Sequence, residues 1–136
     1  MNWKRFCGAV AAVFVVGMIM GFLIHGKLLE ADYRSLGPLN RSPQDAEAHF
    51  PYLVLGAVFS TLAFVWLYAK GVEDKPWIGQ GLRFGVVAWL FGAVSVFLTY
   101  YAVQPLPESL VCKQIGFEFI DFLLLGIVVA CVYRKP

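Results

Sequence analysis

The sequence predicts an all-α integral membrane protein in which four transmembrane helices form one bundle. Four apolar segments, separated by polar connectors, each have about the length that a helix needs to cross a bilayer: 6–24, 50–68, 84–103 and 110–133. The composition agrees, because 60% of the residues are hydrophobic and 15% are charged, whereas about a quarter of the residues in a soluble domain are charged. Little sequence is left for a second domain, so we expect residues 1–136 to form a single domain.

The first segment, 6–24, begins like a secretory signal, since Lys4 and Arg5 precede the apolar run. The run is longer than the apolar core of a signal peptide, and no small-residue cleavage site follows it near His25. We therefore expect an uncleaved membrane anchor.

The connector 26–49 is the only sizeable piece outside the predicted spans. Residues 27–33 could continue the first helix or lie along the membrane interface. Gly37 and Pro38 then interrupt the chain, and Ser42 followed by Pro43 is typical of a capped helix start.

Prolines and glycines separate the remaining helices. Gly71 and Pro76 interrupt the chain between the second and third segments. Pro105 and Pro107 end the third helix and start the fourth. The two helical hairpins show no internal repeat.

The distribution of basic residues predicts the orientation, because short cytoplasmic loops are enriched in Lys and Arg. Seven basic residues lie on the side of both termini and four on the other side, so we expect both termini in the cytoplasm. The two groups are Lys4, Arg5, Lys70, Lys75, Arg83, Arg134 and Lys135, and Lys27, Arg34, Arg41 and Lys113.

Small residues predict where the helices touch, because lipid gives helices no hydrophobic reason to associate and close backbone packing matters instead. The third segment has small residues at spacings that keep them on one helical face: Gly81, Gly85, Ala88, Gly92, Ser95 and Thr99. Shorter stripes are Gly17 and Gly21 in the first segment, and Gly56, Ser60 and Ala63 in the second. We expect packing within the chain, and association with another protein remains an alternative.

The fourth segment departs from the apolar pattern. Gln114, Glu118 and Asp121 follow one another at i, i+4 and i+7 and so project from one face. A carboxylate in the middle of a bilayer normally faces the bundle interior or a water-filled cavity. Three interpretations stay open. The acids could fix helix register by accepting hydrogen bonds, handle a proton or cation in a binding cavity, or contact a partner subunit; the donors considered for the first are Ser60, Ser95, Thr99 and Tyr100.

His25 lies one turn after Gly21, at a depth where it could approach Glu118. The favoured interpretation is an interfacial histidine bonded to backbone or to a lipid headgroup. A haem held by His25 and His49 is disfavoured, because both lie at the membrane edge. We expect no metal site and no cofactor.

The run 17–29, together with 81–85 and the polar start of the last segment, resembles a group of small four-helix bacterial inner-membrane proteins of unassigned function. The resemblance would cover most of the chain. It implies a bacterial inner-membrane location and supplies no activity and no catalytic residues.

Function follows from these patterns only in outline. Motifs of serine hydrolases, zinc proteases, phosphate loops and paired C-x-x-C sites are absent from the sequence, so we expect no enzyme. The net charge of +2 and the scattered basic residues argue against nucleic-acid binding. The first expectation is an accessory or structural subunit that packs in the bilayer against a membrane-protein partner or a second copy. The alternative is a ligand-binding or proton- or cation-linked transport protein that uses Glu118 and Asp121.

Overall fold

The computed structural model describes residues 1–134, and these residues form helices and connecting turns without a strand. Four helical stretches are long and apolar enough to cross a membrane: Trp3–Leu28, Gly37–Gly71, Trp77–Val103 and Glu108–Val132. The predicted fold class, an all-α bundle with four transmembrane helices, is confirmed. Each stretch extends the predicted apolar segment at one or both ends.

Short turns connect the four stretches. Two of the stretches, Trp3–Leu28 and Trp77–Val103, contain a π-helical turn, in which each backbone hydrogen bond spans one residue more than in an α-helix. In chain order the elements are α1 (Trp3–Leu23), the π-turn η1 (Ile24–Leu28), α2 (Glu30–Arg34), the 3₁₀ turn η2 (Gly37–Leu39), α3 (Pro43–Gly71), α4 (Trp77–Trp89), the π-turn η3 (Leu90–Val94), α5 (Ser95–Val103) and α6 (Glu108–Val132).

The helix starts agree with the local sequence. The side chain of Ser42 accepts a hydrogen bond from the backbone N–H of Asp45 at 3.2 Å, and Pro43 occupies the first turn of α3, as predicted. Pro76 and Pro107 stand immediately before α4 and α6.

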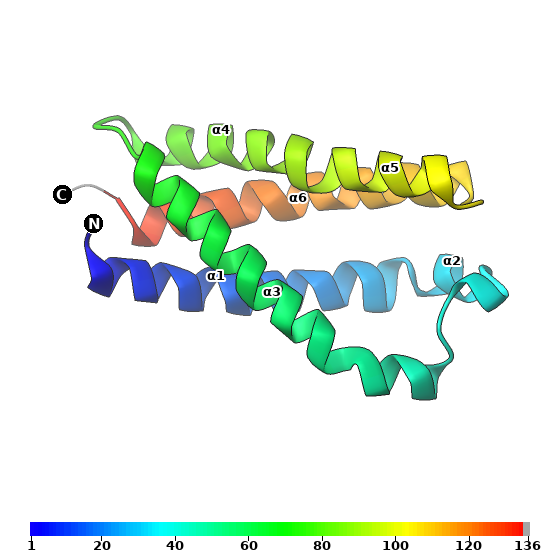
Figure 1. The fold of residues 1–136 in the computed structure, drawn as a ribbon. Coiled ribbons are helices and arrows are strands. Elements are labelled where there is room, and N and C mark those ends of the chain that lie inside the picture. The colour runs from blue at the N-terminus through cyan, green and yellow to red at the C-terminus, as the bar shows by residue number, and fades with distance from the viewer. Residues whose placement is uncertain (135–136) are drawn as a thin grey trace.

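Helix α6 lies between α1 and the continuous rod formed by α4, η3 and α5, while α3 crosses α1 diagonally (Figure 1). Only the second half of α3 reaches the core, where Phe64, Val65 and Tyr68 pack with residues of α1 and α6. The start of α1 and the end of α6 lie beside the α3–α4 connection, at what we call the terminal end of the bundle (Figure 1). The opposite end, which holds α2, is called the far end.

The closest helix pair is α4 with α6. A Cβ atom built on Gly81 would lie 2.5 Å from the carbonyl oxygen of Gly126, and one built on Gly85 would lie 2.5 Å from that of Phe122. Side chains at these positions would hold the two backbones apart. Gly126, which the sequence analysis did not single out, lies directly opposite Gly81 and Gly85.

The small-residue stripe of the third stretch changes face at η3. Gly81, Gly85 and Ala88 are buried before the π-turn, whereas Ser95 and Thr99 are exposed after it. Because a π-turn contains an additional residue, positions beyond it are rotated relative to the α-helical pattern. A Cβ atom built on Gly92, within the turn, would meet the ring of Phe122 at 2.9 Å instead of a backbone atom.

The other stripes lie in open surroundings. Among residues 1–134, a Cβ atom built on Gly17 would meet only the tip of the Leu125 side chain, and one built on Gly21 or Gly56 would have nothing within 4 Å. Ser60 and Ala63 are also exposed. The expectation that the stripe of the second segment packs within the chain was therefore wrong, since the stripe lies on an exposed face of α3 and not on the face of Thr61, Phe64 and Val65 that is buried.

Candidate functional site

The π-turn η1 carries the chain from α1 across the far end of the bundle. After this turn Leu29 becomes fully buried against Ile24 and Leu110. The short helix α2 is then tied to α6 by the ammonium of Lys113, which lies 2.8 and 3.0 Å from the two carboxylate oxygens of Asp32. Helix α2 is therefore held against the polar start of α6, after the helical stretch that begins with α1 has continued through η1 to Leu28.

A chain of hydrogen bonds joins three elements at this point. His25 Nε2 lies 2.8 Å from Glu118 Oε1, and His25 Nδ1 lies 2.7 Å from the Tyr33 hydroxyl. The side-chain amide of Gln114 donates to the same hydroxyl at 2.9 Å. We call these four residues the His25 network: His25, Tyr33, Gln114 and Glu118.

The proton positions in the network follow from the donors available. Burial, with smaller effects from the nearby carboxylates, raises the pKa of Tyr33, which therefore keeps its proton at neutral pH. The Tyr33 hydroxyl accepts from the Gln114 amide, and its own proton can be donated to Nδ1 of His25. In the neutral tautomer of His25 that accepts at Nδ1, the ring proton resides on Nε2 and is donated to Glu118.

Asp121 lies one turn deeper on the same face of α6. Its side chain is 7% exposed, and within residues 1–134 its Oδ1 atom has no hydrogen-bond partner. The Oε1 atom of Gln114 is likewise buried without a partner in that part of the chain. A buried acceptor without a donor is costly, so the face retains capacity to accept a proton or another donor.

Of the donors named for the register interpretation, Ser95 and Thr99 donate to backbone carbonyls one turn earlier, and Ser60 and Tyr100 are exposed. Within residues 1–134, none of these four side chains is bonded to Glu118.

The expectation that His25 bonds to backbone or to a headgroup was wrong, because its two ring nitrogens bond to the side chains of Tyr33 and Glu118. The geometric reason is the π-turn, which directs the ring inward between α2 and α6.

Tyr33 was missed as a network residue. It was noted only as part of a segment near the membrane, and its sequence signal is weak: an aromatic hydroxyl eight residues after a histidine. The structure does not bring His49 into the network, since His49 bonds to Asp45 within α3.

Metal binding is not indicated in the described residues. Nowhere in residues 1–134 do three His, Cys, Asp or Glu side chains gather in a way that could hold a metal ion. The chemistry that the His25 network offers is the exchange of protons between an imidazole and a carboxylate.

Comparison with known proteins gives one partial likeness. The chain is similar to vrtL, an efflux pump of Penicillium aethiopicum, with 29% identity over 80 residues. These residues are 59% of this chain and 15% of the pump. No family model matches the chain, and no solved structure does. The likeness is to a membrane protein and is compatible with the four apolar helices.

Proposed function

We propose that this chain is a small, non-enzymatic membrane protein that takes up and releases protons at His25, Glu118 and Asp121, linked to ligand binding or to transport of a proton or cation. The observation that carries the proposal is the 2.8 Å contact between His25 and Glu118, with buried Asp121 one turn deeper. Ionisable groups within membrane helices are costly and usually serve function.

The arrangement suits proton exchange. Histidine is the side chain whose charge ordinarily changes near neutral pH, and here it bonds directly to a carboxylate that accepts its proton. A second carboxylate, that of Asp121, follows on the same helix face. Protonation of any one of the three changes the charge felt by the other two.

The partial likeness to an efflux pump supports the transport class. The matched part is a small fraction of that pump, so the likeness supports no particular substrate. Because four helices leave little room for a path, the transport proposal includes a homo-oligomer that encloses one.

Flux into reconstituted liposomes tests this function. The wild type should move protons or a cation under a pH gradient, and the double isostere Glu118→Gln with Asp121→Asn should lose that flux while remaining folded. Glu30→Gln is the matched control, because Glu30 pairs with Arg34 on the surface of α2. Absence of flux in the wild type under any proton or cation gradient would count against transport.

A second function, an accessory subunit of the bacterial inner membrane, is favoured by one observation. Gly56, Ser60 and Ala63 form an exposed small-residue face on α3. Such faces let membrane helices approach closely. Gly56→Leu should then reduce cross-linking to a partner or a second copy, whereas Gly116→Leu, at another open glycine, should not. Equal cross-linking of both variants would contradict this function.

A further inference from the structure

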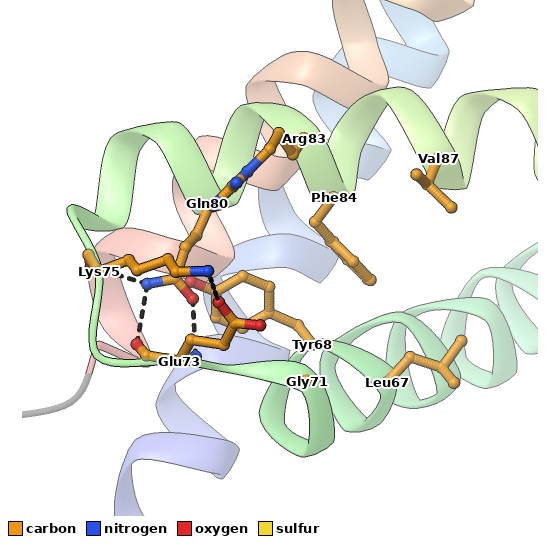
Figure 2. Close-up of a pocket in the computed structure, with 9 residues that line it drawn as sticks. All are labelled: Leu67, Tyr68, Gly71, Glu73, Lys75, Gln80, Arg83, Phe84 and Val87. Atoms are coloured by element: carbon orange, nitrogen blue, oxygen red, sulfur yellow. Dashed lines mark hydrogen bonds and ion pairs between the residues drawn. The ribbon is translucent and has the colours of Figure 1, made fainter.

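A hollow at the terminal end of the bundle is separate from the His25 network. It has a volume of about 270 Å³ and lies between the last turn of α3 and the first turns of α4 (Figure 2). Figure 2 shows the polar side chains of Glu73 and Lys75 at the loop, and Leu67 and Val87 at the opposite end of the hollow. The hollow is therefore amphiphilic along its length.

The polar end is held in shape by Gln80 of α4. Its side-chain oxygen accepts from the backbone N–H of Glu73 at 2.8 Å, and its amide donates to the carbonyls of Glu73 and Lys75 at 2.9 and 2.7 Å. The carboxylate of Glu73 also pairs with the ammonium of Lys75, which offsets its charge. A buried side chain thus fixes the loop around the hollow before any ligand arrives.

Tyr68 lines the hollow beside Gln80 and Phe84 and carries a buried hydroxyl. The residue is 3% exposed, yet within the described residues 1–134 its hydroxyl has no hydrogen-bond partner. A buried hydroxyl without a partner is unfavourable, so an acceptor that reaches it from the hollow, by displacing the side chains that cover it, would satisfy it.

Arg83 supplies a cation. Its side chain lines the hollow and is exposed, and in the part of the chain that the structure describes its guanidinium forms no hydrogen bond or ion pair. Val87 lies one turn further along the same face of α4 and is 62% exposed. The apolar end of the hollow is therefore open sideways, where a bilayer presents hydrocarbon chains.

We propose that this hollow binds an anionic phospholipid, with the phosphate between Arg83 and the Tyr68 hydroxyl and an acyl chain along Leu67 and Val87. Guanidinium and phosphate are complementary in charge and hydrogen bonding. Basic pockets between membrane helices are typical sites for acidic headgroups. A membrane lipid is favoured over free phosphate, because only an amphiphile occupies both the polar and the apolar end.

Lipid retention by the full-length protein tests the proposal. Native mass spectrometry in mixed micelles would compare phosphatidylglycerol with phosphatidylcholine at equal concentration. The wild type should retain phosphatidylglycerol about fivefold more strongly, the effect expected of one interfacial basic residue. Arg83→Gln should remove this preference. Lys4→Gln, which removes an exposed basic residue near the N-terminus of α1, should preserve it.

A second variant, Tyr68→Phe, tests the proposal even if Arg83→Gln does not fold. Tyr68→Phe removes only the hydroxyl without a partner, so it should fold as well as the wild type in phosphatidylcholine and retain less phosphatidylglycerol. Equal retention of the two lipids by the wild type, or equal losses in Arg83→Gln and Lys4→Gln, would overturn the proposal. Complete displacement of phosphatidylglycerol by millimolar glycerol phosphate would assign the site to a soluble phosphate and also overturn it.

Discussion

The orientation of the His25 ring depends on two side chains from different elements. Tyr33 of α2 bonds to Nδ1 and Glu118 of α6 bonds to Nε2, so rotation of the ring breaks both bonds. Gln114 in turn holds the hydroxyl of Tyr33. A residue outside the membrane spans, Tyr33, therefore helps to keep Nε2 of His25 directed at Glu118.

Removing the Tyr33 hydroxyl tests this dependence. Tyr33→Phe leaves Nδ1 of His25 and the amide of Gln114 without a partner, and it should lower the free energy of unfolding by about 1–3 kcal/mol. Thermal unfolding in detergent measures the loss, and nitrogen NMR of the His25 ring should show a changed tautomer population. Tyr100→Phe is the control, since Tyr100 is half exposed and outside the network. Equal unfolding temperatures of the two variants would contradict the role of Tyr33.

The raised pKa of Tyr33 predicts that the stability of the fold decreases at alkaline pH. Burial raises its pKa in the folded state, so the neutral phenol is favoured there. Stability should be unaffected below the ordinary pKa of tyrosine, about 10, and should fall as pH rises from that value through the raised one. Thermal unfolding between pH 9 and about 11 should show a smaller decline for Tyr33→Phe than for the wild type. Parallel declines would mean that Tyr33 does not titrate in this way.

At the scale of elements, the helices were predicted from the sequence, whereas the two π-turns were not. Hydropathy and prolines predicted the helices, and helical spacing placed Gln114, Glu118 and Asp121 on one face. The π-turns η1 and η3 carry no recognisable sequence signal. They bring Tyr33 beside His25 and turn Ser95 away from α6. Neither arrangement could therefore be predicted from the sequence.

The contact of α4 with α6 gives a prediction for single glycines. Gly85→Leu should lower the free energy of unfolding by about 3 kcal/mol, the upper range for an overpacked core, because its Cβ alone would meet a backbone carbonyl at 2.5 Å. Gly92→Leu should be milder, since the ring of Phe122 can move. Gly79→Leu is the control, because it lies in the first turn of α4 with open space around it. Similar unfolding temperatures for all three variants in detergent would show that this contact is not tight.

At the scale of the whole molecule, the two ends of the bundle carry different chemistry. The far end holds the His25 network under α2, and the terminal end holds the amphiphilic hollow between α3 and α4. The sequence predicted the number of spans and the common side of the termini. It did not predict which helices are neighbours, because glycine stripes do not identify their partners; Gly126 opposite Gly81 is the example.

The proposed orientation is tested with reporter fusions. Seven basic residues on the side of the termini, against four on the other, predict under the positive-inside rule that both termini are cytoplasmic. A fusion at the C-terminus should report cytoplasm, and one inserted within 40–47 should report the opposite compartment. The reverse pattern would invert the orientation and place the His25 network on the cytoplasmic side.

The central claim is that protons are exchanged at Glu118 and Asp121 within the bundle. Infrared difference spectra of the protein in liposomes, recorded between acidic and neutral pH, observe carboxyl protonation directly. The account predicts carboxyl bands in the wild type that are missing in the double variant Glu118→Gln with Asp121→Asn and present in Glu30→Gln. Identical difference spectra for the wild type and the double variant would contradict it.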